Sequence, residues 1–341
     1  MDRKDNTQSK KTPIEETGKI YLIEKLLNGS SNSLSDTISA EDGENGHTLV
    51  SHTLLLEGID FDLVYTPLKH LGYKAVLSAI GPVYAACHTP QTISVKIGLS
   101  GRFFTEDVEE LWQGMQAAMD EHKIETAGLD LLPSLTGLTL SLSSQGKQPK
   151  ELFVQMPAPA SGDVICITGS MGAAYMGLQL LEREKALFNS NPGIQPKLDN
   201  YKFILKSYLS PQINTTVPET LLNTKILPSA GEFITRGLSD SVKRVCRRSG
   251  LGARIFLDKL PIASQTFAMA EELNMDPITA ALNGGDDMHL LYVIPLAKYD
   301  DLKKELPALD VIGHLSGAGT GTVLVTPDGS SIELKAQGWS N

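Results

Sequence analysis

The chain has 341 residues, a formal net charge of −10 and a sequence pI near 5.2. Hydrophobic residues make up 41% and charged residues 21% of the chain, which is typical of a globular protein and enough to build about two domains. An acidic chain repels nucleic acid and anionic membrane surfaces, so this composition argues against both as partners. One short basic run, SVKRVCRRSG at residues 241–250, has the spacing of a solvated helix face.

The N-terminal sequence and the cysteines indicate a cellular compartment. MDRKDNTQSKKTPIEETGK lacks the apolar core of a signal peptide, and no apolar run in the sequence is long enough to cross a bilayer. The three cysteines lie far apart without a CxxC pair, which argues against a disulfide framework and a zinc site. We therefore expect a cytoplasmic protein whose cysteines are small core residues.

The first half of the chain predicts a tail, a helix, a loop and then alternating strands and helices. Residues 1–18 are expected to be a disordered tail, followed by a short amphipathic helix, IYLIEKLL, and a polar loop over 28–46. The segment 105–122 predicts a helix with Thr105 as N-cap and acids in its first turn. The other predicted elements are strands in 47–66, 92–99 and 137–144 and a helix over 68–84.

A change of composition at VQMPAPASGD suggests a domain linker. The segment 186–228 is polar and proline-bearing, with one helical piece at 201–209, and a hairpin turns at Pro327-Asp328-Gly329. The remaining predictions are strands at 163–170, 253–258 and 290–295 and helices at 171–185, 238–250, 264–273 and 296–306. This alternation predicts an α/β (α+β) fold with two layered domains, residues 19–155 and 156–341.

Two glycine-rich stretches could carry chemistry. TGSMGAAYMGLQLL at 168–181 could cradle a phosphate, but it matches neither GxGxxG nor a P-loop, so close packing of a helix on a sheet through Gly172 and Gly177 is favoured. Gly284-Gly285-Asp286-Asp287 places two repelling carboxylates after two glycines, and by itself it fits a binding site and a capping turn equally well.

Several blocks in order resemble the thiamine-monophosphate kinase family, within the superfamily of aminoimidazole ribonucleotide synthetase. The resemblance implies two α/β domains, N-terminal domains that pair into a homodimer, and transfer of the ATP γ-phosphate to thiamine monophosphate with magnesium ions held by aspartates. The blocks are HTLVSHTLLLEGIDFDLVYTPLKHLGYKA, TGSMGAAYMGLQLL, GLSDSVKRVCRRSGLGARIFLDKLPI, ALNGGDDMHLLYVIP and AQGW.

The resemblance also assigns candidate site residues. Nucleotide and metal contacts would fall at Asp36, Asp130, Thr235 and Arg236, with Asp36 and Asp130 as metal ligands. Substrate contacts would fall at Asp60, Asp286, Asp287 and Trp339. Lys74 and Gly58 match family positions that we interpret as scaffold.

Most of the family's acidic positions are changed in this chain. Thr53, Pro82, Phe233 and Arg236 stand where the resemblance places acids, and Met156 falls near the position of an ATP-contacting arginine. Asp60 replaces a substrate-facing histidine. We therefore expect phosphoryl transfer to be lost or strongly impaired, since magnesium needs hard oxygen ligands.

Three functions remain open on the sequence. The first is a dimeric kinase homologue that binds a ligand without phosphoryl transfer. The second is an active kinase that uses magnesium and ATP with a reduced metal set, in which Arg236 neutralises phosphate charge. The third is a binder of a thiamine-like cation that uses no cofactor, suggested by Asp60 and Trp339.

Overall fold

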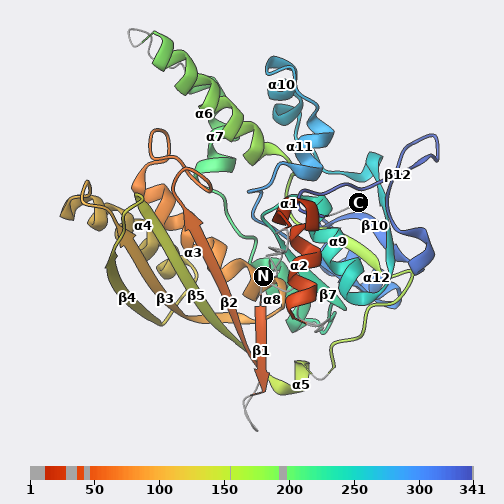
Figure 1. Cartoon of the computed structure of the whole chain (residues 1–341). Coiled ribbons are helices and arrows are strands. Elements are labelled where there is room, and N and C mark those ends of the chain that lie inside the picture. Colours follow the sequence, from red (N-terminus) through yellow and green to blue (C-terminus); the bar gives the residue numbers. More distant parts are fainter. Residues whose placement is uncertain (1–11, 28–36, 42–46, 154, 192–197, 340–341) are drawn as a thin grey trace, which may run out of the picture.

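The computed structural model describes residues 12–27, 37–41, 47–153, 155–191 and 198–339. They form two β-sheets with helices packed against them, the five-stranded sheet on the left of Figure 1 and the seven-stranded sheet on the right. The layered α+β fold predicted from the sequence is confirmed. No helix in these ranges is long and apolar enough to cross a membrane.

The N-terminal half forms the five-stranded sheet, in the order β1-β2-β5-β3-β4. Its strands pair antiparallel, except that β3 and β4 run parallel. Leu138, Leu140 and Leu142 alternate along β5 and are buried on the face covered by helix α3, on which α4 packs. The elements of this half are α1 (Ile14–Thr17), α2 (Lys19–Leu26), β1 (Thr37–Glu41), β2 (His47–Leu56), α3 (Leu68–Ala85), β3 (Thr89–Leu99), α4 (Thr105–Glu121), β4 (Thr126–Pro133), β5 (Leu138–Gln148) and α5 (Lys150–Phe153).

The C-terminal half forms the seven-stranded sheet, in the order β12-β11-β8-β10-β6-β9-β7. The pairing is antiparallel apart from β8 with β11. Its strands are β6 (Val164–Ile167), β7 (Ala230–Ile234), β8 (Gly252–Phe256), β9 (His289–Ile294), β10 (Asp310–Ser316), β11 (Thr322–Val325) and β12 (Ser331–Glu333). Its helices are α6 (Ala173–Ser190), α7 (Lys202–Leu209), α8 (Thr216–Asn223), α9 (Leu238–Ser249), α10 (Ser264–Glu272), α11 (Pro277–Asn283) and α12 (Tyr299–Glu305), with short 3₁₀ turns at Asp199–Tyr201, Leu257–Lys259, Leu296–Lys298 and Ala318–Thr320.

Helix α3 joins the two halves. It contacts β2, β3 and β5 of the first sheet and β7 and β9 of the second. One hydrophobic core therefore contains Ile80 of α3 together with residues from both sheets, among them Leu140 and Tyr292. The apolar stretch that predicted this helix explains its central place, because most of its side chains are buried.

Some predicted boundaries and elements were wrong. The polar loop predicted over 28–46 contains β1, which pairs with β2, and the rest of that loop lies outside the described residues. Strand β4 went unnoticed because it is exposed along its whole length and so lacks the apolar alternation that marks a half-buried strand. Helix α8 was also missed, because its segment is polar and contains a proline. Pro218 lies in the first turn of the helix, where the missing N–H of proline is tolerated. Strands β7 and β10 and helix α11 were missed as well.

Two local predictions were wrong because side chains make contacts that the sequence did not indicate. The N-cap of α4 is Phe104 rather than Thr105, and the backbone N–H of Phe104 donates to the Asp107 carboxylate at 2.8 Å. The basic run on α9 is not a solvated face. Arg244 is buried with its Nε 2.6 Å from Asp240 Oδ2, and Arg248 pairs with Glu232 of β7.

Other predictions were confirmed. Cys87, Cys166 and Cys246 are buried free thiols. The C-terminal hairpin forms between β11 and β12. The predicted disordered tail lies mostly outside the described residues, and its described end forms α1.

Candidate functional site

Two adjoining cavities lie between the loop after β2, the start of α3, helices α6 and α7 and the turn at 283–288. The lysine cavity, which contains Lys74 and Lys185, has a volume of about 410 Å³. The arginine cavity, which contains Lys19 and Arg236, has a volume of about 520 Å³. The two form one joined site, because five residues line both of them: Ile59, Asp60, Leu178, Tyr208 and Asp286.

The two adjacent aspartates of the glycine-rich turn point to different places. Asp286 has a left-handed backbone, with φ 59°, and its N–H donates to the Thr235 carbonyl at 2.8 Å. Its side chain faces the joined cavities. Asp287 is buried instead, and its carboxylate accepts from the Gly172 N–H at 3.0 and 3.1 Å. The turn is therefore both a wall of the site and a structural anchor.

The buried Asp287 explains the TGSMG stretch. Its carboxylate occupies the N-terminus of α6, where a phosphate would otherwise meet the free N–H groups. A Cβ on Gly172 would lie 2.8 Å from the Ala281 nitrogen, and one on Gly177 would lie 2.6 Å from the Ile204 oxygen. Close packing through these two glycines is confirmed, but it is against helices α11 and α7 rather than against a sheet. Burial raises the pKa of Asp287 to about 8, against the opposing effect of the Gly172 and Ala174 N–H groups.

Lys74, which the sequence led us to interpret as scaffold, lines the lysine cavity. Its ammonium lies 3.3 Å from Asp286 Oδ2 and 3.9 Å from the centre of the Tyr208 ring, and the residue is only 7% exposed. A cation so buried favours an anionic partner because it has little access to water. The available signal was the placement of a lysine in the middle of an apolar helix, in GYKAVLSAI.

Asp60 and Arg236 complete the polar part of the site. The Leu56 N–H donates to Asp60 Oδ2 at 2.7 Å, and burial raises the pKa of this carboxyl. Nearby Asp286 raises that pKa further, whereas Arg236 lowers it, so the three charges interact across the arginine cavity.

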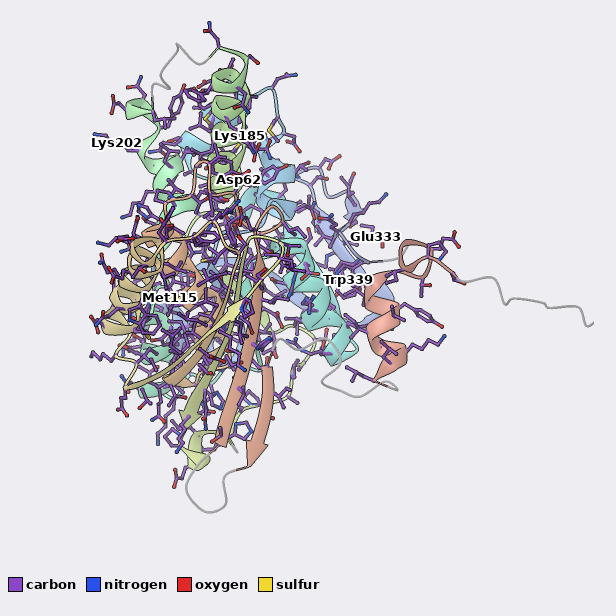
Figure 2. All side chains as sticks on the ribbon, turned by 60° about the vertical axis from the view of Figure 1, so that its left-hand side comes forward. Asp62, Met115, Lys185, Lys202, Glu333 and Trp339 are labelled. Atoms are coloured by element: carbon purple, nitrogen blue, oxygen red, sulfur yellow. The ribbon has the colours of Figure 1, made fainter. Side chains whose placement is uncertain are left out.

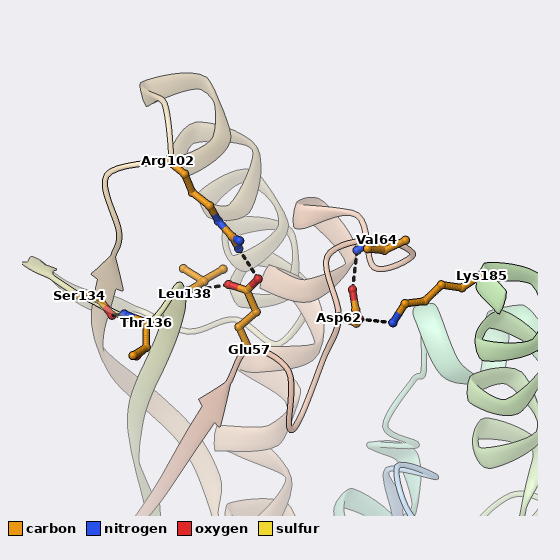
Figure 3. Close-up of polar contacts among 8 residues, drawn as sticks. All are labelled: Glu57, Asp62, Val64, Arg102, Ser134, Thr136, Leu138 and Lys185. Carbon is orange, nitrogen blue, oxygen red and sulfur yellow. Dashed lines mark hydrogen bonds and ion pairs between the residues drawn. The ribbon is translucent and has the colours of Figure 1, made fainter. Parts of the chain in front are cut away.

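The loop between β2 and α3 is fixed across the site to α6. Asp62 accepts from Lys185 Nζ at 2.6 Å and from the Val64 N–H at 2.8 Å (Figure 3). The Tyr65 hydroxyl donates to Glu182 Oε1 at 2.6 Å. Figure 2 shows Asp62 and Lys185 near each other where the two halves of the chain meet. These contacts hold the loop over the lysine cavity.

The other end of this loop is also anchored. Glu57 pairs with Arg102 and accepts from the Leu138 N–H at 2.8 Å (Figure 3). Because both ends are fixed, the Asp60 side chain between them has a defined position in the site.

Acidic and basic side chains are equal in number in the lining of the joined cavities. Two cations already have close carboxylate partners, since Lys74 pairs with Asp286 and Lys185 with Asp62. A site with both signs and no large excess suits a zwitterion better than a simple anion. The ionic lining residues are the acids Asp60, Asp62, Glu182 and Asp286 and the bases Lys19, Lys74, Lys185 and Arg236.

The candidate residues are thus partly brought together. Asp60, Thr235, Arg236 and Asp286 share the arginine cavity. Trp339, labelled in Figure 2, packs against α9 beside this cavity. Its indole N–H donates to Asp240 Oδ1 of that helix at 2.7 Å.

Of the two candidate metal ligands, the one that the structure describes does not join them. Asp130 lies on the exposed edge strand β4, 3.9 Å from Lys96, and lines neither cavity. Asp36 lies outside the described residues.

Comparison with known proteins finds thiamine-monophosphate kinases among the similar sequences. The thiamine-monophosphate kinase of Aquifex aeolicus is 26% identical over 332 residues, covering 96% of this chain and 98% of the relative. The corresponding protein of Synechococcus elongatus is 27% identical over 247 residues, covering 71% of each chain. No family model matches the sequence. The chain is therefore similar to thiamine-monophosphate kinases over most of its length.

Solved structures of similar proteins have the same fold. The structure "AaThiL complexed with AMPPCP and TMP" matches with a TM-score of 0.79 at 22% identity, covering 96% of this chain and 98% of the other. The hydrogenase maturation protein HypE in complex with ATP matches with a TM-score of 0.66 at 16% identity, covering 87% of each chain. At these identities the structural likeness supports the shared fold.

Three of the family positions that are changed here meet in a separate pocket. Pro82, Met156 and Phe233 line a hollow of about 240 Å³ between β1, the end of α3 and β7, which we call the Phe233 pocket. Two of these three positions were expected to carry acids and the third an arginine, so the replacements cluster in space although they are far apart in the sequence.

The described residues offer no preformed cluster of metal ligands. No group of three or more His, Cys, Asp or Glu side chains within the described ranges is arranged to hold a metal ion. Glu232, an acid lining the Phe233 pocket, is paired with Arg248. The ring of Phe233 is buried, 5% exposed, and packs against Gly81.

Proposed function

We propose that this chain binds a thiamine phosphate in the joined lysine and arginine cavities and that its transfer of phosphate from ATP is lost or strongly impaired. The observation that carries the proposal is the contrast between two sites. The joined cavities keep a dense set of charged groups, whereas the Phe233 pocket has Pro82, Met156 and Phe233 where the resemblance places two acids and an arginine.

The charges of the joined cavities complement a thiamine phosphate. Its thiazolium ring carries a permanent positive charge, which Asp60 and Asp286 would stabilise beside the Tyr208 ring. Its phosphate would pair with Lys74 or Arg236. The relative solved with AMPPCP and TMP supports this class of ligand.

The proposal extends to the organisation of the molecule. We propose an N-terminal domain over 19–155, a C-terminal domain over 156–341 and a homodimer that forms through the N-terminal domains. The outer face of the five-stranded sheet supports the dimer, because Ile38, Val50 and Leu54 are 70%, 39% and 51% exposed there. Buried free thiols support a reducing, cytoplasmic location.

A second candidate is an active kinase with a reduced metal set. The observation in its favour is that Asp60, Asp286 and Arg236 share one cavity, so that Arg236 could balance phosphate charge in place of an ion. The further alternative, a binder of a thiamine-like cation that never meets nucleotide, would use Asp60 and Trp339 but not Arg236.

Calorimetric titration with thiamine monophosphate and with thiamine, followed by a magnesium-dependent kinase assay, separates these functions. The main proposal predicts that the phosphate ester binds at least about tenfold more tightly than thiamine, with little or no turnover. Turnover near that of an ordinary kinase would support the second candidate. Equal affinity for both ligands would support the cation binder, and no binding of either would refute all three.

A further inference from the structure

A further pocket lies between the two halves of the chain, at the C-terminal ends of α3 and α4, and we call it the His122 pocket. It has a volume of about 270 Å³, and helix α8 of the second half also lines it. None of its lining residues lines the lysine cavity or the arginine cavity. The His122 pocket is therefore separate from the site described above.

His122 is a buried polar group in the lining of this pocket. The residue is only 6% exposed, and its Nδ1 lies 3.2 Å from the hydroxyl oxygen of Tyr84. Its Nε2 is buried without a hydrogen-bond partner among the described residues. Burial lowers the pKa of this imidazole, against the opposing effect of Glu121, so the ring is neutral at pH 7. When Nδ1–H donates to Tyr84, Nε2 carries a lone pair that can accept from a ligand.

Two carboxylates give the pocket a negative potential. Burial raises the pKa of Tyr84 to about 12, and the charges of Glu219 and Glu121 also act to raise it. Both acids line the pocket, so their negative charge reaches its buried part. Lys123 is the basic residue in the lining, and both histidines there, His88 and His122, have lowered pKa values. The lining at pH 7 thus has two acids against one base, which favours a cation.

The rest of the lining favours an organic cation over a metal ion. The described residues contain no group of three or more His, Cys, Asp or Glu side chains arranged to hold a metal. His88 has both ring nitrogens engaged, since Nε2 lies 2.9 Å from His47 Nδ1 and Nδ1 lies 2.7 Å from the Ala86 carbonyl oxygen. Pro218 and Leu222 of α8 supply apolar surface. This mixture suits an ammonium group on a short apolar chain.

We propose that the His122 pocket binds a small primary ammonium compound with a short apolar chain. The ammonium group donates hydrogen bonds to the carboxylates of Glu219 and Glu121 and to Nε2 of His122, while the apolar chain packs on Pro218 and Leu222. Because the lining comes from both halves of the chain, the ligand links the end of α4 to α8. This inference does not depend on the thiamine phosphate proposal, because it concerns a different pocket.

A charge series on one short chain tests the inference. The full chain with isotope-labelled histidines is titrated at pH 7 with butylammonium, butanol and butyrate, and NMR spectra follow the binding. Butylammonium is expected to bind in the millimolar range, as suits so small a ligand. Its affinity should exceed that of butanol and of butyrate at least about tenfold. Equal affinities for the three compounds, or no binding at about 50 mM butylammonium, would overturn the proposal.

Two variants of exposed glutamates locate the binding. Glu219→Gln keeps the shape of the side chain, removes its charge and is expected to weaken butylammonium binding at least about threefold. The matched control is Glu110→Gln, on α4 outside the His122 pocket, which should bind butylammonium like the parent chain. Circular dichroism checks that both variants are folded. If Glu219→Gln binds like the control, the proposal is wrong.

The His122 ring gives a direct readout of the same titration. Its resonance, identified by its loss in His122→Phe, is expected to shift with butylammonium and to stay in place with butyrate. A resonance that does not move while butylammonium binds would place the ligand elsewhere and overturn the proposal. The comparison of Glu219→Gln with its control decides the question without the His122→Phe variant.

Discussion

At the scale of single residues, the turn at 284–287 divides its two carboxylates between binding and structure. The left-handed backbone of Asp286, with φ 59°, sends neighbouring side chains to different environments. Asp286 meets Lys74 in the cavity, whereas Asp287 meets the start of α6. The repulsion expected from two adjacent acids is reduced because each has its own partner.

Lys74→Met should weaken binding of thiamine monophosphate at least about tenfold, because a charge-assisted contact with phosphate contributes about 1.5–3 kcal/mol. Methionine keeps much of the apolar stem, so thermal stability should change little. Calorimetric titration measures the affinity. The matched control is Lys96→Met, an exposed lysine on β3 that pairs with Asp130. If both variants bind like the parent chain, the ligand does not use the lysine cavity.

Asp287 should make stability depend on pH. Because its folded pKa, about 8, is raised above the unfolded value, the stability that it contributes is present below pH 4 and is lost as pH rises through 8. One such group lowers the free energy of unfolding by at most about 1.4 kcal/mol per pH unit.

Asp287→Asn should remove this contribution, because the amide does not titrate but its oxygen can still accept from the Gly172 N–H. Urea unfolding at pH 5, 6, 7 and 8 should give the parent chain a steeper loss of stability than the variant. Parallel curves for the two proteins would show that Asp287 is ionised throughout this range.

At the scale of elements, α6 depends on a close approach that only glycine permits. Gly172 has φ 83°, and its missing side chain lets the helix start meet α11 near Ala281. This contact also brings the Gly172 N–H to Asp287, so one position fixes both the packing and the anchor.

Gly172→Ala should lower the free energy of unfolding by about 2–4 kcal/mol, from backbone strain together with the clash. Gly250→Ala is the matched control, since φ is 69° but nothing lies within 4 Å of the added Cβ. It should cost about 1–2 kcal/mol, from strain alone. Urea unfolding measures both. Equal losses would mean that α11 moves aside without cost.

The sequence predicted the elements whose pattern reflects burial. Helices α3 and α9 and strand β5 were predicted because apolar residues recur at the helical or the strand period. Strand β1 was missed because its polar sequence takes a strand conformation by pairing with β2, a contact with another part of the chain.

At the scale of the whole molecule, α3 links the two sheets and lines both the lysine cavity and the Phe233 pocket. The sequence predicted Asp60, Thr235, Arg236 and Asp286 as site residues, and the fold does bring these four together. It could not predict the role of Lys74, which depends on Asp286, a residue 212 positions away. Nor could it predict that Pro82, Met156 and Phe233 line one pocket.

Leu54→Lys on the outer face of the five-stranded sheet should shift the chain from dimer to monomer, because a buried charge would disfavour the proposed sheet contact. Size-exclusion chromatography with light scattering measures the mass. Leu135→Lys is the control, because Leu135 is fully exposed on the turn between β4 and β5. A parent chain that is monomeric at micromolar concentration would refute the dimer.

The most direct test of the account is phosphorus-31 NMR of the chain mixed with an equal amount of thiamine monophosphate and then with ATP and magnesium. The account predicts that the resonance of thiamine monophosphate shifts or broadens on addition of the protein, and that no diphosphate resonance grows after ATP is added. A growing thiamine diphosphate signal would contradict the loss of phosphoryl transfer, and an unperturbed thiamine monophosphate resonance would contradict the binding site itself.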